Sequence, residues 1–223
     1  MILLLTLILT TTLGLGGLNL NPLIPTLPTP HASADALTDY PWVGVYPPDI
    51  VAQYVDNWDA HLNPEHLNDW KRLSREILGP PSAWWDRYRA GTPLDRLVYE
   101  AARKIEYWVS PYDDVDPHGI KYRYYLNTRY GAWKTLQLGR GNCCDHAHLM
   151  IALCRAAGIP ARYRVETTYF PNWGTGGHVC VEVALPKHIQ NGKAQEVTWV
   201  RMDPTNPNSR CVHLRATYAN LPF

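Results

Sequence analysis

A short stretch in the middle of the chain constrains the fold most, because it encodes a helix with a thiol at its first turn. The glycine-rich run Gly139-Arg140-Gly141-Asn142 leads directly into Cys143. Apolar residues then recur at helical spacing, at Ala147, Met150, Ile151, Cys154 and Ala157. Gly158 is a natural residue to end a helix, and Pro160 cannot continue one. The pattern therefore predicts a core helix of about four turns with a cysteine at its N-terminus.

The position of Cys143 gives its thiol a specific chemistry. A free cysteine has a pKa of about 8.5, and only the thiolate attacks well. The unpaired N–H groups and partial positive charge of a helix N-terminus favour that anion. The backbone N–H of Cys143 can also serve as one donor of an oxyanion hole. The second donor is left open by the sequence, with Trp133, Gln137 and Asn142 as weak candidates.

A histidine and an aspartate follow the thiol in segments that read as strands. His178 lies in the run 176–182 and Asp203 in the run 200–205. Cysteine, histidine and aspartate together can carry out nucleophilic acyl transfer. We expect His178 to take or share the proton of Cys143, and Asp203 to accept a hydrogen bond from the other ring nitrogen. Each residue alone would more often be structural, so the interpretation depends on all three occurring together.

The remaining cysteines leave several alternatives open. Cys143 and Cys144 point about 100° apart on a helix, so only one can face a common site, and either could be a small buried hydrophobe. Cys144 and His148 share a helix face, which raises a zinc alternative, but no C-x-x-C or H-x-x-x-H spacing supports it. We therefore predict no metal site. Five cysteines leave at least one thiol unpaired in a monomer, and the pairing stays open for Cys144, Cys154, Cys180 and Cys211.

The same residues carry a resemblance to a known family. The run from Gly139 to Arg164, G-R-G-N-C-C-D-H-A-H-L-M-I-A-L-C-R-A-A-G-I-P-A-R-Y-R, resembles the core motif of the transglutaminase-like superfamily. In that motif the nucleophile lies two residues after a glycine and four before an alanine, which Cys143 satisfies and Cys144 does not. The H-x-x-x-E-V strand of the family is similar to His178–Val183, and its W-x-x-x-D-P-T segment is similar to Trp199–Thr205.

This resemblance covers about residues 92–210 and implies both a fold and a set of roles. The implied fold is α+β, a transglutaminase-like or papain-like cysteine protease core in which the catalytic helix packs on an antiparallel sheet. The implied catalytic residues are Cys143, His178 and Asp203.

A narrower resemblance concerns archaeal pseudomurein endoisopeptidases, which cut an isopeptide bond to a lysine side chain in cell-wall peptide. It rests on the run Tyr124–Ala132, followed by Gly141-Asn142-Cys143 and Asp145. It implies a secreted cysteine (iso)peptidase that hydrolyses an amide or isopeptide bond through a thioester. The alternatives are a transglutaminase-type cross-linking acyltransferase and a non-catalytic wall-binding protein.

Three regions are predicted along the chain. Residues 1–34 read as a secretory leader ending at Ala32-Ser33-Ala34, or as a membrane anchor if this segment is not cleaved. Residues 35–91 form a helical N-terminal extension, and residues 92–223 form the catalytic domain. We therefore expect a secreted protein located outside the cell or in the cell wall, with membrane anchoring as the alternative.

The individual elements follow from caps, prolines and periodicity. Asn63 followed by Pro64 predicts a capped helix that runs to about Leu78, and Thr92-Pro93 predicts a second helix that ends at Ser110. Strands are predicted at 162–169, 177–184 and 196–202, with an insertion at 186–198 between the last two. Helices followed by antiparallel strands favour an α+β domain.

Composition limits the partners. The net charge of +1 and the lack of a basic run argue against nucleic acid. We expect a monomer acting on a peptide or cell-wall peptide and requiring no cofactor. Calcium binding by a small acidic loop is a weak alternative to a solvated turn; its residues are Asp113, Asp114 and Asp116.

Overall fold

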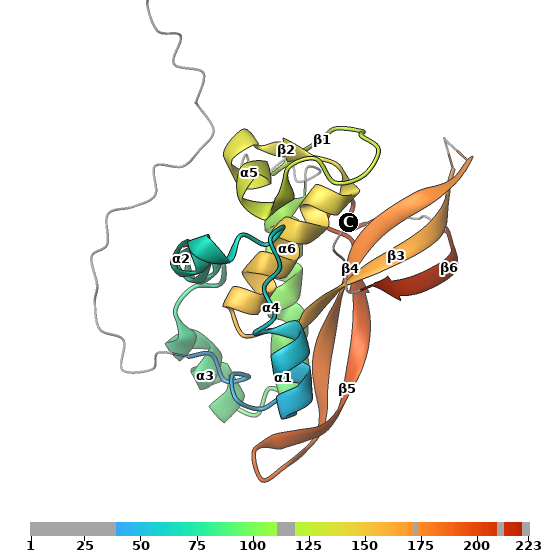
Figure 1. Cartoon of the computed structure of the whole chain (residues 1–223). Coiled ribbons are helices and arrows are strands. Elements are labelled where there is room, and N and C mark those ends of the chain that lie inside the picture. The colour runs from blue at the N-terminus through green and yellow to red at the C-terminus, as the bar shows by residue number, and fades with distance from the viewer. Residues whose placement is uncertain (1–38, 111–118, 172–173, 209–211, 220–223) are drawn as a thin grey trace, which may run out of the picture.

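The computed structural model describes residues 39–110, 119–171, 174–208 and 212–219 (Figure 1). The predicted leader or anchor, the acidic loop of Asp113, Asp114 and Asp116, and Cys211 lie outside the described residues. The helical segments are α1 (Pro48–Tyr54), η1 (Pro64–His66), α2 (Leu67–Leu78), α3 (Pro81–Arg89), α4 (Leu94–Val109), α5 (Gly131–Leu138) and α6 (Cys143–Ala156). The strands are β1 (Lys121–Tyr122), β2 (Arg140–Gly141), β3 (Ala161–Phe170), β4 (Gly174–Gln190), β5 (Lys193–Met202) and β6 (Val212–Ala219).

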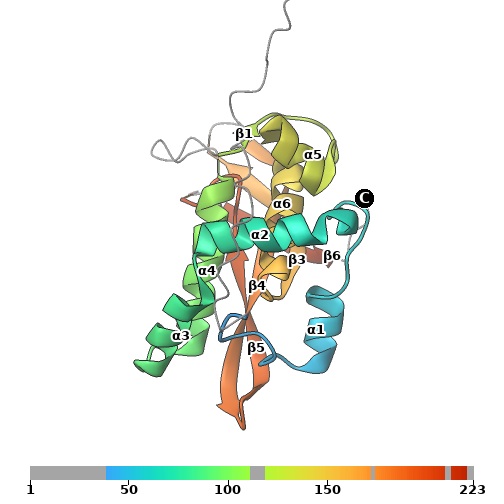
Figure 2. The same ribbon diagram turned by 90° about the vertical axis from the view of Figure 1, so that its left-hand side faces the viewer.

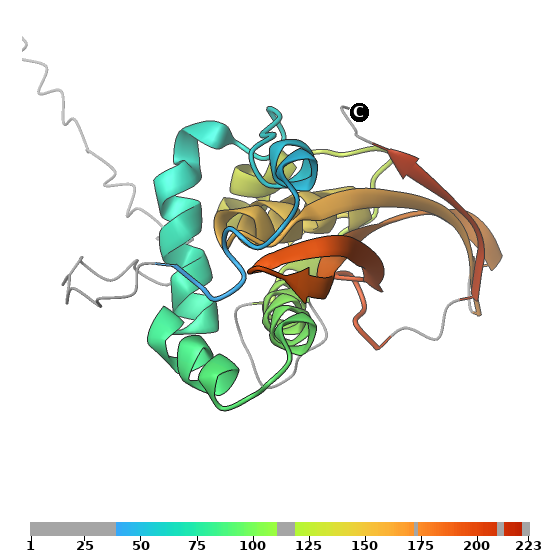
Figure 3. The same ribbon diagram turned by 90° about the horizontal axis from the view of Figure 1, so that it is seen from below.

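Helices pack on one side of an antiparallel sheet. The sheet has the order β5-β4-β3-β6, and α6 contacts both β3 and β4. Figure 3 shows the strands curving past the helices, and Figure 2 shows α2 lying across α4 and α6. Short parallel strands β1 and β2 lie at the end of the molecule where α6 begins. The predicted α+β class, with a helix packed on an antiparallel sheet, is confirmed.

The α6 helix is buried on all sides, which goes beyond the single apolar face predicted from the sequence. Every residue from Cys144 to Arg155 is buried, including Asp145, His146 and His148. Helices that pack against sheet and helices at once need no solvated face. Buried polar groups require hydrogen-bond partners, and the guanidinium of Arg155, for example, donates to the carbonyl of Ala161 at 2.8 Å.

The helices before residue 91 share this core. The indole of Trp42 donates to the Ala157 carbonyl at 2.9 Å, and the Ser74 hydroxyl donates to the Leu153 carbonyl at 2.8 Å. Both bonds tie the N-terminal half of the chain to the C-terminal half of α6. The domain boundary proposed at residue 91 stays a prediction. Among the described residues, no helix has the length and apolar character needed to cross a membrane.

Two local expectations were wrong. Asn63 does not cap the helix: it has a φ of 57° and makes no side-chain cap, a 3-10 turn follows it, and α2 begins only at Leu67. Its side-chain oxygen accepts from the backbone N–H of Trp133 at 3.0 Å instead. The segment 186–198 is not an insertion between separate strands, because β4 and β5 run through it as one hairpin. Asn191-Gly192 forms its turn with positive φ at both residues, the signature of a tight hairpin.

The carboxylate of Asp145 fixes the start of α6. One of its oxygens accepts from the Thr128 hydroxyl at 2.9 Å and from three backbone N–H groups at 2.9 to 3.2 Å, those of Arg129, Tyr130 and Gly131. The other accepts from the N–H of Asn142 at 3.1 Å. A Cβ at position 141 would lie 2.5 Å from the Asp145 Cβ, so this close approach requires Gly141. One buried side chain therefore joins the loop, the turn and the helix.

Replacing Asp145 should lower the free energy of unfolding substantially. In Asp145→Ala, several buried donors lose their acceptor, and each unsatisfied group costs about 1–3 kcal/mol. We expect the free energy of unfolding, measured by urea titration, to fall by at least about 3 kcal/mol. The control is Asp69→Ala, which removes partly exposed contacts with Arg72 and His66 and should cost less than about 1 kcal/mol. Equal losses in the two variants would contradict this role of Asp145.

Candidate active site

Cys143 occupies the first helical position of α6, as predicted. Asn142 and Asp145 form a capping box: each side chain accepts a hydrogen bond from the backbone N–H of the other. The N–H groups of Cys143 and Cys144 are not among the donors of this box. The Cys143 side chain is partly exposed, whereas that of Cys144 is buried. The thiol therefore lies at an electropositive helix end with access to the surface.

The sheet brings His178 and Asp203 together. His178 lies in β4, and Asp203 follows directly after β5, whose last residue pairs with Val181. The Nε2 atom of His178 lies 2.9 Å from Oδ2 of Asp203, and both side chains are buried. The Cys143 thiol is hydrogen-bonded to the His178 ring and to the N–H of Val179. Because Asp203 occupies Nε2, Nδ1 is the nitrogen left to face the sulfur.

The electrostatics of the site favour a charged pair. A hydrogen bond with Cys144 is the largest influence on the pKa of Cys143; together with the hydrogen bond and charge of His178, it outweighs burial and lowers this pKa to about 4. Burial alone would lower the pKa of His178, but hydrogen bonds to Asp203 and Cys143 and their charges raise it to about 10. Between these values the site holds a thiolate beside an imidazolium.

Two residues that the sequence reasoning missed hold Asp203. Arg201 donates to its Oδ2 at 2.9 Å and also to Glu166 at 2.7 Å. Glu106, on α4, accepts from the backbone N–H of Asp203 at 2.6 Å. Burial is the main reason that the pKa of Glu106 rises to about 7. Two signals were available in the sequence. Arg201 lies two residues before Asp203, on the same face of an extended segment, and Glu106 is a carboxylate at a helix position otherwise occupied by core residues.

The weak oxyanion candidates do not reach the thiol. The Asn142 amide is committed, donating to the carbonyls of Tyr125 at 3.2 Å and Asn127 and accepting from the Asp145 N–H. Trp133 stacks on the ring of His66, with centroids 3.7 Å apart. Gln137 is exposed on α5. None of the described contacts joins these side chains to Cys143, and the second oxyanion donor stays a prediction.

The other cysteines show no catalytic geometry. Cys144, Cys154 and Cys180 are buried free thiols, and burial is the main cause of a raised pKa at Cys154 and Cys180. The Nδ1 atom of His148 contacts the Tyr163 hydroxyl at 2.5 Å. Among the residues that the structure describes, no group of three or more potential ligands could hold a metal.

Two cavities lie away from the thiol. One, of about 510 Å³, lies along α4 and includes Tyr99 and Trp108; the other, of about 290 Å³, includes Lys71 and Gly158 at the C-terminal end of α6. Neither includes Cys143, so the assignment of the site rests on side-chain chemistry rather than on cavity size.

Comparison with known proteins identifies the family of this chain. Residues 87–204, a stretch that contains Cys143, His178 and Asp203, match the family described as the transglutaminase-like superfamily. The chain belongs to the transglutaminase-like superfamily. A crystal structure of a candidate cysteine protease from Cytophaga hutchinsonii is similar at 19% sequence identity and a TM-score of 0.38, covering 76% of this chain and 58% of that one. No curated protein matches the sequence.

The charge of Asp203 should be visible in the titration of His178. In Asp203→Asn the carboxylate is lost, so the pKa of His178 should fall from about 10 while Cys143 still holds it above the unperturbed value of about 6.5. The measurement is NMR titration of the labelled ring. Asp69→Asn, which changes a carboxylate on α2, should leave the His178 titration unchanged. An unaltered His178 pKa in Asp203→Asn would show that the two side chains do not interact in solution.

Proposed function

We propose that this protein is a cysteine (iso)peptidase that hydrolyses an amide or isopeptide bond through a thioester. The observation that carries the proposal is the Cys143–His178–Asp203 arrangement, with a thiolate at the end of α6 and a protonated ring beside it. A thiolate–imidazolium pair supplies both a nucleophile and a proton donor, the two requirements of acyl transfer from an amide.

In the first step, the Cys143 sulfur attacks the carbonyl carbon and a tetrahedral oxyanion forms. The N–H groups of Cys143 and Cys144, which the capping box does not use, are placed to receive that negative charge. As the carbon–nitrogen bond breaks, His178 gives its proton to the leaving amine. The products are a thioester on Cys143, a free amine and a neutral histidine.

In the second step, water replaces the amine. Neutral His178 takes a proton from the water as its oxygen attacks the thioester carbon, and the carbon–sulfur bond then breaks. A carboxylic acid leaves, and the thiolate–imidazolium pair is restored. Asp203 keeps the ring oriented throughout, with its own position held by Arg201 and Glu106. The partial exposure of Cys143 gives water access to the thioester.

The finer proposal concerns the substrate. We take it to be cell-wall peptide of the pseudomurein type, cut at an isopeptide bond to a lysine side chain by an enzyme located outside the cell or in the wall. Two points about the run Tyr124–Ala132 support this substrate. The run resembles pseudomurein endoisopeptidases, and it lies beside the proposed site. Its residues 128–131 bond directly to Asp145, two residues after Cys143.

The test uses isolated methanogen wall peptide with and without an added amine donor. A hydrolase releases free amino groups over time and incorporates no donor. Incorporated amine without net release would instead identify an acyltransferase. Tight pelleting with the wall and no turnover would identify a binding protein. Either of these last two results would overturn the proposed hydrolysis.

Two single variants assign the nucleophile. Cys143→Ala should lower turnover by at least about 10⁴, because the thioester cannot form. Cys144→Ala should keep turnover near neutral pH within about tenfold. It removes the hydrogen bond that most lowers the pKa of Cys143, so the acid limb of its pH–rate profile should move to higher pH. Wild-type activity in Cys143→Ala would refute the assignment.

A further inference from the structure

The segment that leads into α6 carries positive charge only. Between Gly119 and Asn142 the sequence contains no aspartate or glutamate. Four of its cations are exposed and lie outside α5; we call Lys121, Arg123, Arg129 and Arg140 the basic rim. Like charges gathered on one surface repel each other, so such a cluster gains free energy when an anion binds to it.

Backbone bonds hold the basic rim at the first turn of α6. Lys121 and Arg140 are partners in the parallel pair of β1 and β2. The N–H of Arg123 donates to the Gly141 carbonyl at 2.7 Å, two residues before Cys143. The N–H of Arg129 donates to Asp145 at 3.1 Å, two residues after Cys143. Among the described residues, none forms an ion pair with these four cations.

Two tyrosines hold guanidinium groups of the basic rim: Tyr125 through its ring for Arg129, and Tyr130 through a hydrogen bond for Arg140. Arg129 lies over the ring of Tyr125, with its central carbon 5.3 Å from the centroid. The hydroxyls of Tyr125 and Tyr130 lie 3.2 Å apart. Tyr125 is the largest cause of a lowered pKa at Tyr130, and Arg140 and Arg129 also lower it. Arginines held against rings lose less entropy when they bind a ligand than freely moving ones do.

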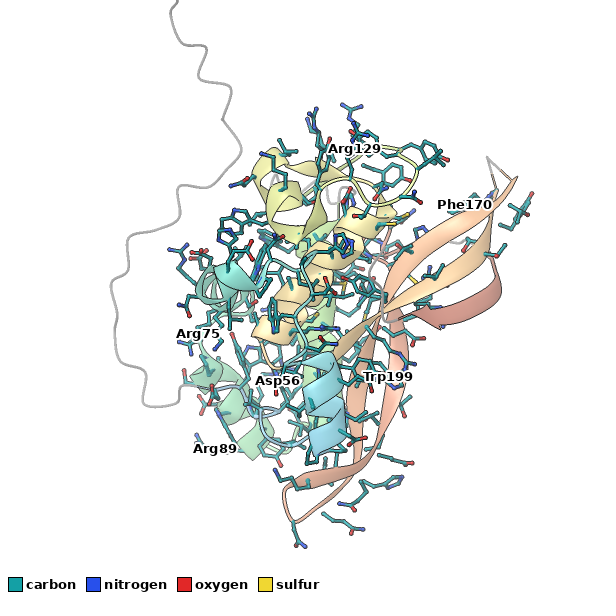
Figure 4. All side chains as sticks on the ribbon, in the orientation of Figure 1. Asp56, Arg75, Arg89, Arg129, Phe170 and Trp199 are labelled. Carbon is teal, nitrogen blue, oxygen red and sulfur yellow. The ribbon has the colours of Figure 1, made fainter. Side chains whose placement is uncertain are left out.

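The other flank of the thiol is formed by the end of β3 and the start of β4. Residues 167–171 and 174–177 contain no lysine, arginine, aspartate or glutamate. Phe170 lies edge-on to His178, with ring centroids 5.7 Å apart. Figure 4 shows Phe170 at this end of the sheet and Arg129 at the end of the molecule where α6 begins. A substrate at Cys143 therefore meets cations on one side and an aromatic, neutral surface on the other.

We propose that the basic rim binds a carboxylate of the substrate near the bond that is cut, so that the enzyme selects acidic peptides. The proposal rests on the proposed function, since it assigns the substrate class of that same site. Arg129 and Arg140 are the main contacts, because their guanidinium groups are held in place and can bind a carboxylate through two parallel hydrogen bonds.

The test needs no turnover and uses two alkylating reagents of similar size. Iodoacetate carries a carboxylate and iodoacetamide does not; in both reactions the Cys143 sulfur bonds to the methylene carbon and iodide leaves. The measured quantity is the ratio of the two rates at low ionic strength, with the modified residue identified by mass spectrometry. In Arg129→Glu/Arg140→Glu the ratio should fall by about fivefold, because two attractive charges near the thiol become repulsive toward iodoacetate.

Matched controls separate the rim from the rest of the protein. Lys71→Glu changes an exposed cation at the opposite end of α6 and should leave the ratio unchanged. Lys121→Glu/Arg123→Glu should also lower the rate ratio, and it does so without changing the arginines that contact Tyr125 and Tyr130. In the wild type, added salt should lower the ratio with no substitution at all. The proposal would be overturned if salt did not change the rate ratio of the wild type and if both rim variants had the same ratio as the wild type.

A peptide arm tests the substrate class itself. N-acetyl-hexaglutamate amide should protect Cys143 of the wild type from iodoacetamide, and the matched hexaglutamine peptide should not. This protection should be lost in Arg129→Glu/Arg140→Glu and kept in Lys71→Glu. Equal protection by both peptides, or protection only by an oligonucleotide, would contradict selection of acidic peptides. Because none of these readouts needs catalysis, absence of turnover on wall peptide would count against the proposed function alone.

Discussion

The site depends first on the buried carboxylate of Asp145. It accepts hydrogen bonds from the loop 128–131 and from Asn142, and so fixes the first turn of α6 against the segment before it. Without this contact, residues 128–131 would lose their bonds to the helix, and only the Asn142 amide would join the loop to the start of α6. The same bond explains why Gly141 must lack a side chain. A structural carboxylate two residues after the thiol therefore sets up the geometry on which the chemistry relies.

The second constraint is electrostatic. Burying a thiolate and an imidazolium costs free energy unless each charge is paired and hydrogen-bonded. Here Cys143 and His178 pair with each other, Asp203 pairs with the ring, and Arg201 pairs with Asp203 and Glu166. Alternating charges continue from the helix end into the sheet. This chain of partners lets a reactive anion persist in a mostly buried position, and the basic rim extends positive charge to the surface beside it.

The fold class and the α6 helix were predictable from the sequence, and the features that were not predicted have physical causes. The α6 helix and the α+β class follow from local signals: a cap, an apolar period and a glycine–proline stop. The β4–β5 hairpin was read as an insertion although Asn191-Gly192 marked its turn. Glu106 reaches Asp203 only through tertiary packing, which no local pattern encodes. Arg201 lies two residues before Asp203, so its contact is local in sequence and was overlooked. The oxyanion candidates were chosen by proximity in sequence, but the fold turns their side chains to other partners. The substrate and location stay predictions.

The central claim is that Cys143 is a thiolate throughout the physiological pH range, and its direct test is a pH titration of the thiolate ultraviolet absorbance. Subtracting the titration of Cys143→Ala isolates the signal of this one sulfur. The account predicts that the difference signal appears as the pH rises through about 4 and stays constant through neutrality. A signal that appears only near the ordinary cysteine pKa of about 8.5 would contradict the account.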